Sequence, residues 1–383
     1  MKRLSLLPGN MRPNKKPYLI VAQSGRSLAV SAALADIHSI VIDRFADMDT
    51  QSCALSTQIV RGDDSGLNSI HLLEILDNYI DMSVAGVVVG SGLEARPEIL
   101  DIIDRKFPLM GNKAPCVKSC KDPGQFFSLL DSLNISHPDI SLTGGFSGER
   151  CLVKQIGGTG GQHINHYVNK MEPSVAHYYQ RFIRGRSLSI LFLADGHQAS
   201  ILGVNETWAR DPENNDFRYA GAVTLNKIEP MIFTDLRDIV QVLVKNMQLF
   251  GLCSLDVIVD DDRGCHVLEI NPRPTATIEL HERGFGLFYA HIMACQGNLI
   301  AMPKDSTMVQ GHAVLFADTN FTVPQFDWPA WVVDRSPPGT KIASGEPICT
   351  IRAAAKIPVV VRELLQRRGE LLKDRMGLHS VAA

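Results

Sequence analysis

The sequence LCSLDVIVDDDRGCHVLEINPRP spans residues 252–274 and decides which fold the chain adopts. Two runs in which apolar and polar residues alternate flank an acidic turn that ends in Gly264. This pattern is typical of a β-hairpin, because alternate side chains of a strand point to opposite faces of a sheet. The stretch therefore predicts two antiparallel strands that present one apolar face and one polar face.

The register of this hairpin follows from an even-numbered turn centred between Asp262 and Arg263. Three pairs then face one another: Leu255 with Ile270, Asp256 with Glu269, and Val257 with Leu268. A slip of one residue would place Asp256 against Ile270 and mix both faces, so the pattern favours the even register. A bulge at Gly264 would change it.

Two carboxylates that face each other across neighbouring strands repel unless a positive charge lies between them. Asn271 adds a neutral oxygen on the same face as Asp256 and Glu269, and Arg273 points the same way. Carboxylate and amide oxygens suit a hard cation such as Mg²⁺, which keeps positions open for phosphate oxygens. The alternative is a half-exposed acidic hairpin with solvated charges, but these acids lie within the strands and not in the turn.

A second stretch, LVKQIGGTGGQ at residues 152–162, places Lys154 on a strand before four glycines within five positions. Glycines let backbone N–H groups approach phosphate oxygens closely, and a lysine on a strand supplies a fixed positive charge. The alternative is a glycine-rich hairpin turn beside a surface lysine.

A competing motif, VVVGSGLEA at residues 87–95, resembles the loop of a dinucleotide site. The pattern is short, it follows a third strand, and Pro97 places the next helix later than such a site requires. Polar side chains at the carboxyl end of a sheet still suit a small substrate, so we assign Ser91, Glu94 and Arg96 to a substrate site.

The order of apolar runs predicts an α/β chain that begins with a parallel sheet. Strands are expected at residues 18–22, 39–43 and 84–90, with helices at 28–35 and 70–80 between them. A long amphipathic helix is expected to open at Thr234 and to close at Gly251, and a basic one to span Val359 to Arg375. The expected organisation is a flexible basic tail at 1–17, an N-terminal α/β domain at 18–112, a nucleotide domain at 113–300 with its lid at about 113–183, and C-terminal strands with a basic helix at 301–383.

The composition excludes several classes of function. The 383 residues include 38 Lys and Arg against 41 Asp and Glu, a formal charge of -3, which is unlike the strongly basic surface of a nucleic-acid-binding protein. The sequence contains no apolar run of about 18 residues, so we expect no transmembrane helix. The eight scattered cysteines lack a zinc spacing and are expected to be reduced, which favours the cytoplasm.

Taken in order, these motifs resemble the ATP-grasp superfamily, and within it the branch related to biotin carboxylase and carbamoyl-phosphate synthase. The resemblance runs from about Tyr18 to Arg352 and is most specific at Glu269-Ile-Asn-Pro-Arg273. It implies an ATP-grasp fold, with an N-terminal parallel-sheet domain and two sheets that clamp ATP.

The resemblance also implies roles for single residues. ATP would contact Lys113, Lys154, the glycine-loop residues Gly157, Gly158, Thr159, Gly160 and Gly161, and the adenine slot formed by Gln180, Arg181, Phe182 and Ile183. Mg²⁺, or Mn²⁺ in its place, would bind Asp256, Glu269 and Asn271. Arg273, together with Lys154, would face the reacting phosphoryl group. Arg186 departs from the family pattern, in which an acid lies near the ribose.

The implied reaction is that of a carboxylate-amine ligase, which activates a small carboxylate as an acyl phosphate and transfers it to an amine. Within the superfamily the frame is similar to the ligases that join tyramine to glutamate in the biosynthesis of methanofuran-like one-carbon cofactors. Two alternatives remain: a carboxylase-type subunit that uses bicarbonate, and a nucleotide-binding protein without turnover. The sequence leaves open whether the chain forms a homo-oligomer.

Overall fold

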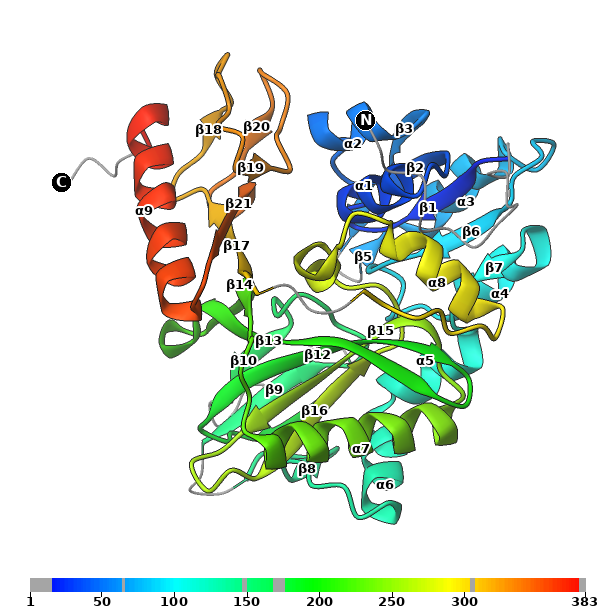
Figure 1. Ribbon diagram of the computed structural model, residues 1–383, viewed down its shortest axis with the longest axis vertical. Coiled ribbons are helices and arrows are strands. Elements are labelled where there is room, and N and C mark those ends of the chain that lie inside the picture. Colours follow the sequence, from blue (N-terminus) through cyan, green and yellow to red (C-terminus); the bar gives the residue numbers. More distant parts are fainter. Residues whose placement is uncertain (1–15, 64–65, 147–149, 168–175, 304–306, 379–383) are drawn as a thin grey trace.

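The computed structural model describes residues 16–63, 66–146, 150–167, 176–303 and 307–378. The expected tail at 1–17 therefore lies almost wholly outside the described residues. The molecule has three lobes: an N-terminal parallel sheet, a lower lobe built on the largest sheet, and a C-terminal lobe that extends the same sheet (Figure 1). Within the described residues no helix is both long and apolar enough to cross a lipid bilayer.

The N-terminal lobe is a five-stranded sheet in the order β3-β2-β1-β6-β7, and all its neighbouring strands are parallel. This confirms the predicted parallel sheet. Its elements are β1 (Tyr18–Val21), α1 (Arg26–Leu34), β2 (Ser39–Asp43), α2 (Met48–Cys53), β3 (Ser56–Ile59), β4 (Gly62–Asp63), β5 (Gly66–Leu67), α3 (Ser69–Asp77), β6 (Gly86–Val89), α4 (Glu98–Lys106) and β7 (Leu109–Met110). Because parallel strands end at one edge, the loops after β1, β2 and β6 meet there.

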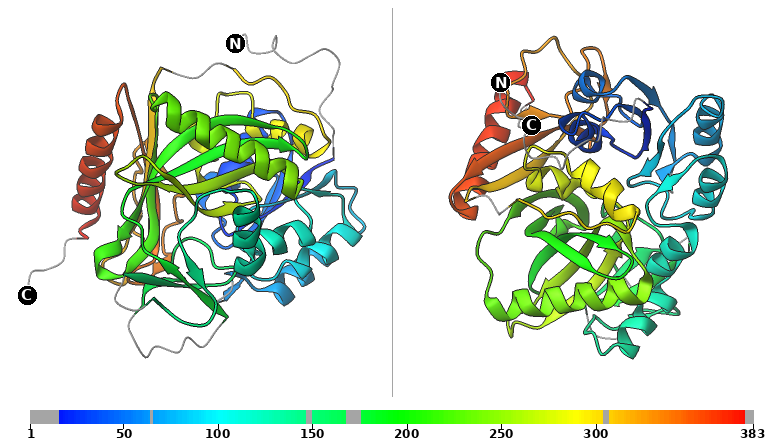
Figure 2. Two further views of the ribbon diagram at one scale, coloured as in Figure 1. Left: turned by 90° about the horizontal axis from the view of Figure 1, so that it is seen from below. Right: turned by 45° about the vertical axis from the view of Figure 1, so that its right-hand side comes forward.

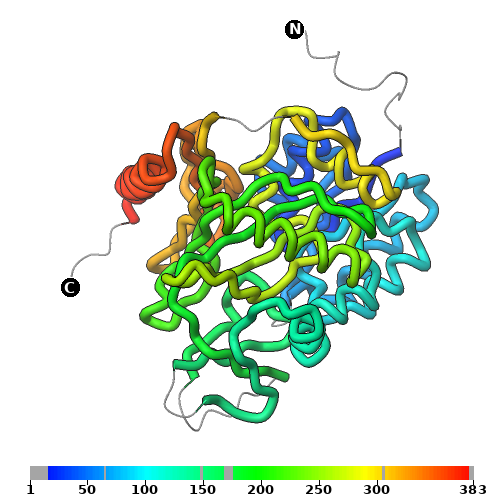
Figure 3. Tube along the Cα trace, turned by 60° about the horizontal axis from the view of Figure 1, so that its bottom comes forward, coloured from blue at the N-terminus to red at the C-terminus, as the bar shows by residue number. Residues whose placement is uncertain are grey.

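A four-stranded sheet in the order β10-β9-β11-β8 follows in the chain. Its elements and the helices before it are α5 (Ala114–Lys121), α6 (Pro123–Ser132), β8 (Ile140–Ser141), β9 (Cys151–Gln155), β10 (Ile164–His166) and β11 (His177–Arg181). Figure 3 shows this teal-to-green segment at the bottom of the molecule, beneath the large sheet.

The large sheet has eight strands in the order β16-β15-β12-β13-β14-β17-β21-β19. Its first part contains β12 (Arg186–Asp195), β13 (Ala199–Asp211), η1 (Pro212–Asn214), β14 (Asp216–Thr224), α7 (Pro230–Met247), β15 (Phe250–Val259), β16 (Cys265–Asn271), η2 (Ala276–His281) and α8 (Leu287–Cys295). The C-terminal part contains β17 (Val309–Phe316), β18 (Phe321–Thr322), β19 (Val332–Val333), β20 (Lys341–Ile342), β21 (Pro347–Ala355) and α9 (Pro358–Met376). Figure 2 shows α9 on the outer side of the sheet, which matches the expected basic helix.

The ends of α7 differ from the sequence prediction. The helix begins at Pro230 and not at Thr234, because proline has no N–H to lose and is well placed in the first turn. It ends at Gln248, whose φ of 50° is left-handed. Gly251 does not end the helix but belongs to β15.

Both faces of the large sheet are covered. Alternate residues of β12 and β15, such as Ile190 and Leu255, pack with α7, α5 and α6, while Leu191 and Leu252 pack with α1 and α8 on the opposite face. Asp256 follows Leu255, so its side chain points away from α7 toward the face that the four-stranded sheet shares. The strand alternation therefore places an acid between the two sheets.

Candidate active site

The acidic hairpin has the register expected for its two carboxylates. Asp256 lies directly opposite Glu269, and Leu255 lies opposite Ile270, as predicted. The predicted pair of Val257 with Leu268 is wrong, because Val257 lies opposite Val267 after a break in the register. The turn between Val259 and Cys265 holds five residues, an odd number, and a bulge at Leu268 restores the register at the acids.

Two side chains connect these carboxylates. The Asn271 amide nitrogen donates to Asp256 Oδ2 at 3.0 Å and lies 3.4 Å from Glu269 Oε1. The ammonium of Lys121, at the end of α5, donates to Glu269 Oε2 at 3.1 Å and to Asn271 Oδ1 at 2.9 Å. A positive charge therefore lies beside the acid pair. It belongs to Lys121, which the sequence analysis did not identify.

The spacing of the apolar residues in α5 indicates which way the Lys121 side chain points. Ala114, Val117 and Cys120 are buried, so one face of the helix points into the protein. Lys121 is four residues after Val117 and thus lies on the same face. Its side chain is only 7% exposed, which a lysine tolerates when anions receive its charge.

The pKa values around the acids show how closely the charges interact. Burial raises the pKa of Glu269, but the ammonium groups of Lys121 and Lys154 together hold it well below its usual range. Burial and the charge of Glu269 raise the pKa of Asp256 to about 7. Burial lowers the pKa of Lys154, while both acids oppose that shift. The cluster thus combines two buried lysines with two half-buried acids whose charges act on one another.

The donor set fits a hard divalent cation. Two carboxylates and one amide oxygen are ligands that Mg²⁺ accepts, and Lys121 already shows that positive charge is favoured between Glu269 and Asn271. The described residues contain no group of three or more His, Cys, Asp or Glu side chains suited to a metal. A metal held by this smaller set would need phosphate or water oxygens to complete its shell.

The glycine loop joins β9 to β10 above this cluster. Lys154 on β9 is 7% exposed and faces the acids, since both acids influence its pKa. Gly157 has a φ of 73°, and a Cβ there would come within 2.5 Å of Ala95 Cα in the N-terminal lobe. A Cβ at Gly161, with a φ of 83°, would come within 2.0 Å of the Phe217 carbonyl oxygen on β14. The loop therefore packs closely against two lobes, which only glycine allows at these positions.

Of the residues predicted to line the adenine slot, Gln180 points its side chain to the face of the sheet that carries Lys154. Tyr178 pairs with Lys154 and Gln180 pairs with Leu152, so the side chains of these four residues lie on one face of the sheet. Gln180 is 1% exposed, and its buried Nε2 has no hydrogen-bond partner among the described residues. A buried donor without a partner costs free energy, so this amide is suited to a ligand.

The other residues of that slot lie differently. Arg181 points to the opposite face, where its guanidinium is 3.1 Å from Asp139. Phe182 lies under the guanidinium of Arg150, 4.4 Å from its ring centre, and Ile183 is half-buried. That these residues line an adenine slot remains a prediction.

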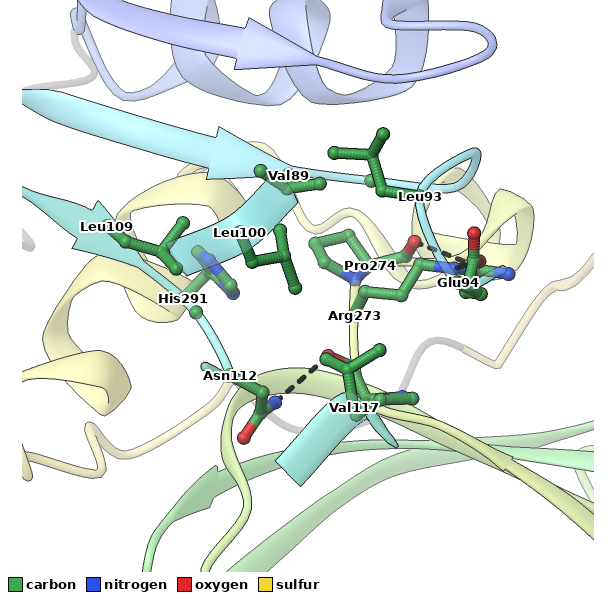
Figure 4. A pocket seen from close by; sticks show the side chains of 13 residues that line it. Val89, Leu93, Glu94, Leu100, Leu109, Asn112, Val117, Arg273, Pro274 and His291 are labelled. Carbon is green, nitrogen blue, oxygen red and sulfur yellow. Dashed lines mark hydrogen bonds and ion pairs between the residues drawn. The ribbon is translucent and has the colours of Figure 1, made fainter. Parts of the chain in front are cut away.

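Arg273 connects the hairpin with the N-terminal lobe. Its guanidinium forms a buried ion pair with Glu94 (Figure 4). Its Nη2 lies 3.3 Å from Asn271 Oδ1. Burial raises the pKa of Glu94, but the charge of Arg273 more than offsets this and holds it below its usual range. Glu94 belongs to the loop that the sequence analysis assigned to the substrate site. It thus positions Arg273, which the sequence analysis assigned to the reacting phosphoryl group.

The remaining predicted residues lie apart from the acids. Arg96 donates to Asp63 and to the Leu67 carbonyl, both at 2.7 Å, whereas Ser91 lines the central cavity. Lys113 has a 65% exposed side chain and pairs with Asp104 at 2.8 Å. The structure therefore brings Lys121, and not Lys113, to the carboxylates.

A cavity of about 730 Å³ lies where the three lobes meet. It is lined by the loops after β1, β2 and β6, by the glycine loop from Gly158 to Gly160, and by β21 from Pro347 to Thr350. Pro274 to Ala276, directly after Arg273, also line it. The cavity therefore adjoins the acidic cluster and has the size of a small-molecule site.

Comparison with known proteins identifies a domain and a fold. Residues 125–277 match the family model described as an ATP-grasp domain. The biotin carboxylase domain of 2-oxoglutarate carboxylase from Hydrogenobacter thermophilus, solved with MgADP and bicarbonate, is similar, with a TM-score of 0.72 and 12% identity over 91% of this chain and 88% of that one. An L-amino acid ligase from Bacillus licheniformis has a TM-score of 0.69 and 12% identity over 94% and 98% of the two chains.

An N5-carboxyaminoimidazole ribonucleotide synthetase from Thermotoga maritima is also similar, with a TM-score of 0.66 and 13% identity over 93% of this chain and 98% of that one. At identities of 12% and 13%, the similarity to these structures shows a shared fold and does not show a shared activity. No curated protein sequence matches the chain.

Proposed function

Because the chain carries an ATP-grasp domain and has the ATP-grasp fold, we propose that it is an ATP-dependent ligase that joins a small carboxylate to an amine. ATP and Mg²⁺ are its proposed cofactors, and ADP and phosphate leave as products. The observation that carries this proposal is the half-buried cluster in which Asp256 faces Glu269 beside Lys121 and Lys154. A silenced site would be expected to have lost one of its key residues, whereas Lys154, Asp256, Glu269, Asn271 and Arg273 are all present.

The proposed mechanism assigns a task to each group of the cluster. Asp256, Glu269 and Asn271 would hold Mg²⁺, which when bound neutralises charge on the phosphate oxygens. Lys121 and Lys154 are positioned to take up the negative charge of the triphosphate once it displaces their present partners. Arg273 stabilises the charge that develops when the substrate carboxylate attacks the γ-phosphate.

The acyl phosphate formed in this way must be kept from water until the amine attacks it. The glycine loop covers the site between Ala95 and Phe217, so closure of this loop would exclude water. The adjoining cavity is the proposed place of the acid and the amine.

For the substrates we propose glutamate and tyramine. The support is the resemblance of the frame, and in particular of the GEPICT segment at residues 345–350, part of which lines the cavity. The cytoplasm is the proposed location, in keeping with eight free cysteines.

A bicarbonate-using carboxylase is the second candidate, because two similar folds are a biotin carboxylase domain solved with bicarbonate and an N5-carboxyaminoimidazole ribonucleotide synthetase. The two candidates differ in what stimulates ADP release: a ligase needs an organic acid and an amine, and a carboxylase needs bicarbonate.

We expect ADP release to depend on one acid and one amine together. The test follows ADP release with Mg²⁺ and ATP over a matrix of amino acids and amines that begins with glutamate and tyramine, and mass spectrometry identifies the amide. Bicarbonate with a biotin or aminoimidazole acceptor forms a separate row. Stimulation only in that row would favour the carboxylase, and no stimulation in any row would contradict turnover.

A further inference from the structure

A chain of four hydrogen-bonded side chains lines the central cavity outside the acidic cluster. Tyr219 on β14 contacts His312 on β17, with 2.6 Å between Oη and Nε2. His312 Nδ1 lies 2.7 Å from Glu279 Oε1 in η2, and Arg26 of α1 lies 2.5 Å from the other Glu279 oxygen. Tyr219, His312, Glu279 and Arg26 all line the cavity. Four separate elements thus build one polar chain at its wall.

The charges around this chain set the direction of its hydrogen bonds. Burial raises the pKa of Glu279, but Arg26 and His312 hold it well below its usual range, so its carboxylate is ionised. An ionised carboxylate accepts a hydrogen bond from His312 Nδ1–H, which leaves the Nε2 lone pair to accept from the Tyr219 hydroxyl. Asp334, 2.7 Å from Arg26, is the other anion that faces this arginine. A tyrosine, a histidine and a carboxylate in this order form a path for a proton.

Tyr219 is joined through its backbone to the glycine loop. The backbone N–H of Tyr219 donates to the Gly160 carbonyl of the glycine loop at 3.0 Å. Burial raises the pKa of Tyr219 well above its usual range, and the charges of Glu279 and Asp256 raise it further. Tyr219 lines the cavity together with Gly158 to Gly160 of the glycine loop, which gives it access to a small molecule bound there.

The proposed ligation needs a proton acceptor at this place. An alkyl amine resembles a lysine side chain, with a pKa of about 10, and is therefore an ammonium ion at neutral pH. An ammonium ion has no lone pair with which to attack an acyl phosphate. Glu269 is paired with Lys121, and Asp256 accepts a hydrogen bond from Asn271. Both acids are the proposed metal ligands, so they are poorly placed to accept this proton.

We propose that Tyr219 is a catalytic residue that takes a proton from the attacking amine, with His312 and Glu279 as positioning residues of a proton relay. This inference rests on the proposed function. As the ammonium proton moves to Tyr219 Oη, the phenol proton moves to His312 Nε2, and the imidazolium is stabilised by Glu279. The nitrogen lone pair forms the C–N bond, and the C–O bond to phosphate breaks with its electron pair. The second nitrogen proton leaves with the phosphate, and the relay returns its proton to water.

The experiment compares two nucleophiles in the acid-amine pair that gives the fastest ADP release in the matrix above. Hydroxylamine is uncharged at pH 7.5 and does not need the first deprotonation, whereas the amine does. We expect Tyr219→Phe to lower amide formation by about 100-fold, the usual value of a general base, and hydroxamate formation from the same acid by less than about threefold. Tyr79→Phe, which removes the hydroxyl of a buried tyrosine in the N-terminal lobe, is the matched control and should change neither.

Three outcomes overturn the relay in distinguishable ways. An equal loss of both products would mean that Tyr219 only holds β14 to β17, and no loss of amide would mean that the phenol takes no part. A wild-type protein without any active acid-amine pair would contradict the proposed function itself, and the relay with it. If Tyr219→Phe does not fold, as judged by circular dichroism, His312→Gln gives the same comparison because it keeps a polar side chain of similar reach.

Discussion

Replacing Glu269 by Gln is expected to stop Mg²⁺-dependent ADP release while the fold remains intact. Gln has the same shape but no charge, so it is a poor ligand for Mg²⁺ and leaves Asp256 as the one remaining carboxylate of the pair. Groups that stabilise charge at a reacting centre are commonly worth about 10²–10³ in kcat, and we expect a loss of at least this size. The measurement is the ADP release rate as a function of Mg²⁺ concentration.

The matched control is Asp261→Asn. Asp261 lies in the exposed turn of the same hairpin, so the same change of charge is made a few residues from the acids but outside the cluster. This variant should keep the wild-type rate. Unfolding of both variants by urea separates lost activity from lost stability, and an active Glu269→Gln protein would mean that the ligand assignment is wrong.

Replacing Lys121 by Gln is expected to lower kcat/KM for ATP by about 100-fold, because charge-assisted contacts to phosphate are among the strongest hydrogen bonds. Lys121 is almost fully buried, and its ammonium already lies against Glu269 and Asn271. Triphosphate that binds beside the metal would meet this charge first. Initial rates at varied ATP concentration measure the effect.

The Lys113→Gln variant tests which lysine binds ATP: Lys121, which the structure places at the carboxylates, or Lys113, which the resemblance named. Lys113 is largely exposed, and surface ion pairs such as its contact with Asp104 are worth about 0–1 kcal/mol. We therefore expect its kcat/KM for ATP to remain close to that of the wild-type protein. A large loss in Lys113→Gln with little change in Lys121→Gln would return the role to the lysine that the resemblance named.

The parts of the site that could be predicted are those set by local pattern. The facing of Asp256 and Glu269 follows from alternation along two strands, because a slip would bury charge and expose apolar residues. The bulge at Leu268 could not be predicted, since it depends on how an odd-numbered turn is accommodated in the middle of a strand. The start of α7 was misjudged because an acidic segment around Asp235 looked like a first turn, although Pro230 begins the helix.

Contacts between distant parts of the chain escaped prediction. Lys121 reaches Glu269 only because α5 docks beside β16, and the pair is separated by 148 residues. Glu94 and Arg273 are 179 residues apart, and Tyr219 and His312 are 93 apart. Such pairs depend on how the lobes pack, for which neither spacing nor periodicity carries a signal.

The most direct test of the account is a crystal structure with Mg²⁺ and a non-hydrolysable ATP analogue. We expect the metal to lie at Asp256, Glu269 and Asn271, the phosphates to contact Lys121 and Lys154 under the glycine loop, and the base to lie against Gln180. A triphosphate bound elsewhere, with Asp256 and Glu269 left open to solvent, would contradict the account.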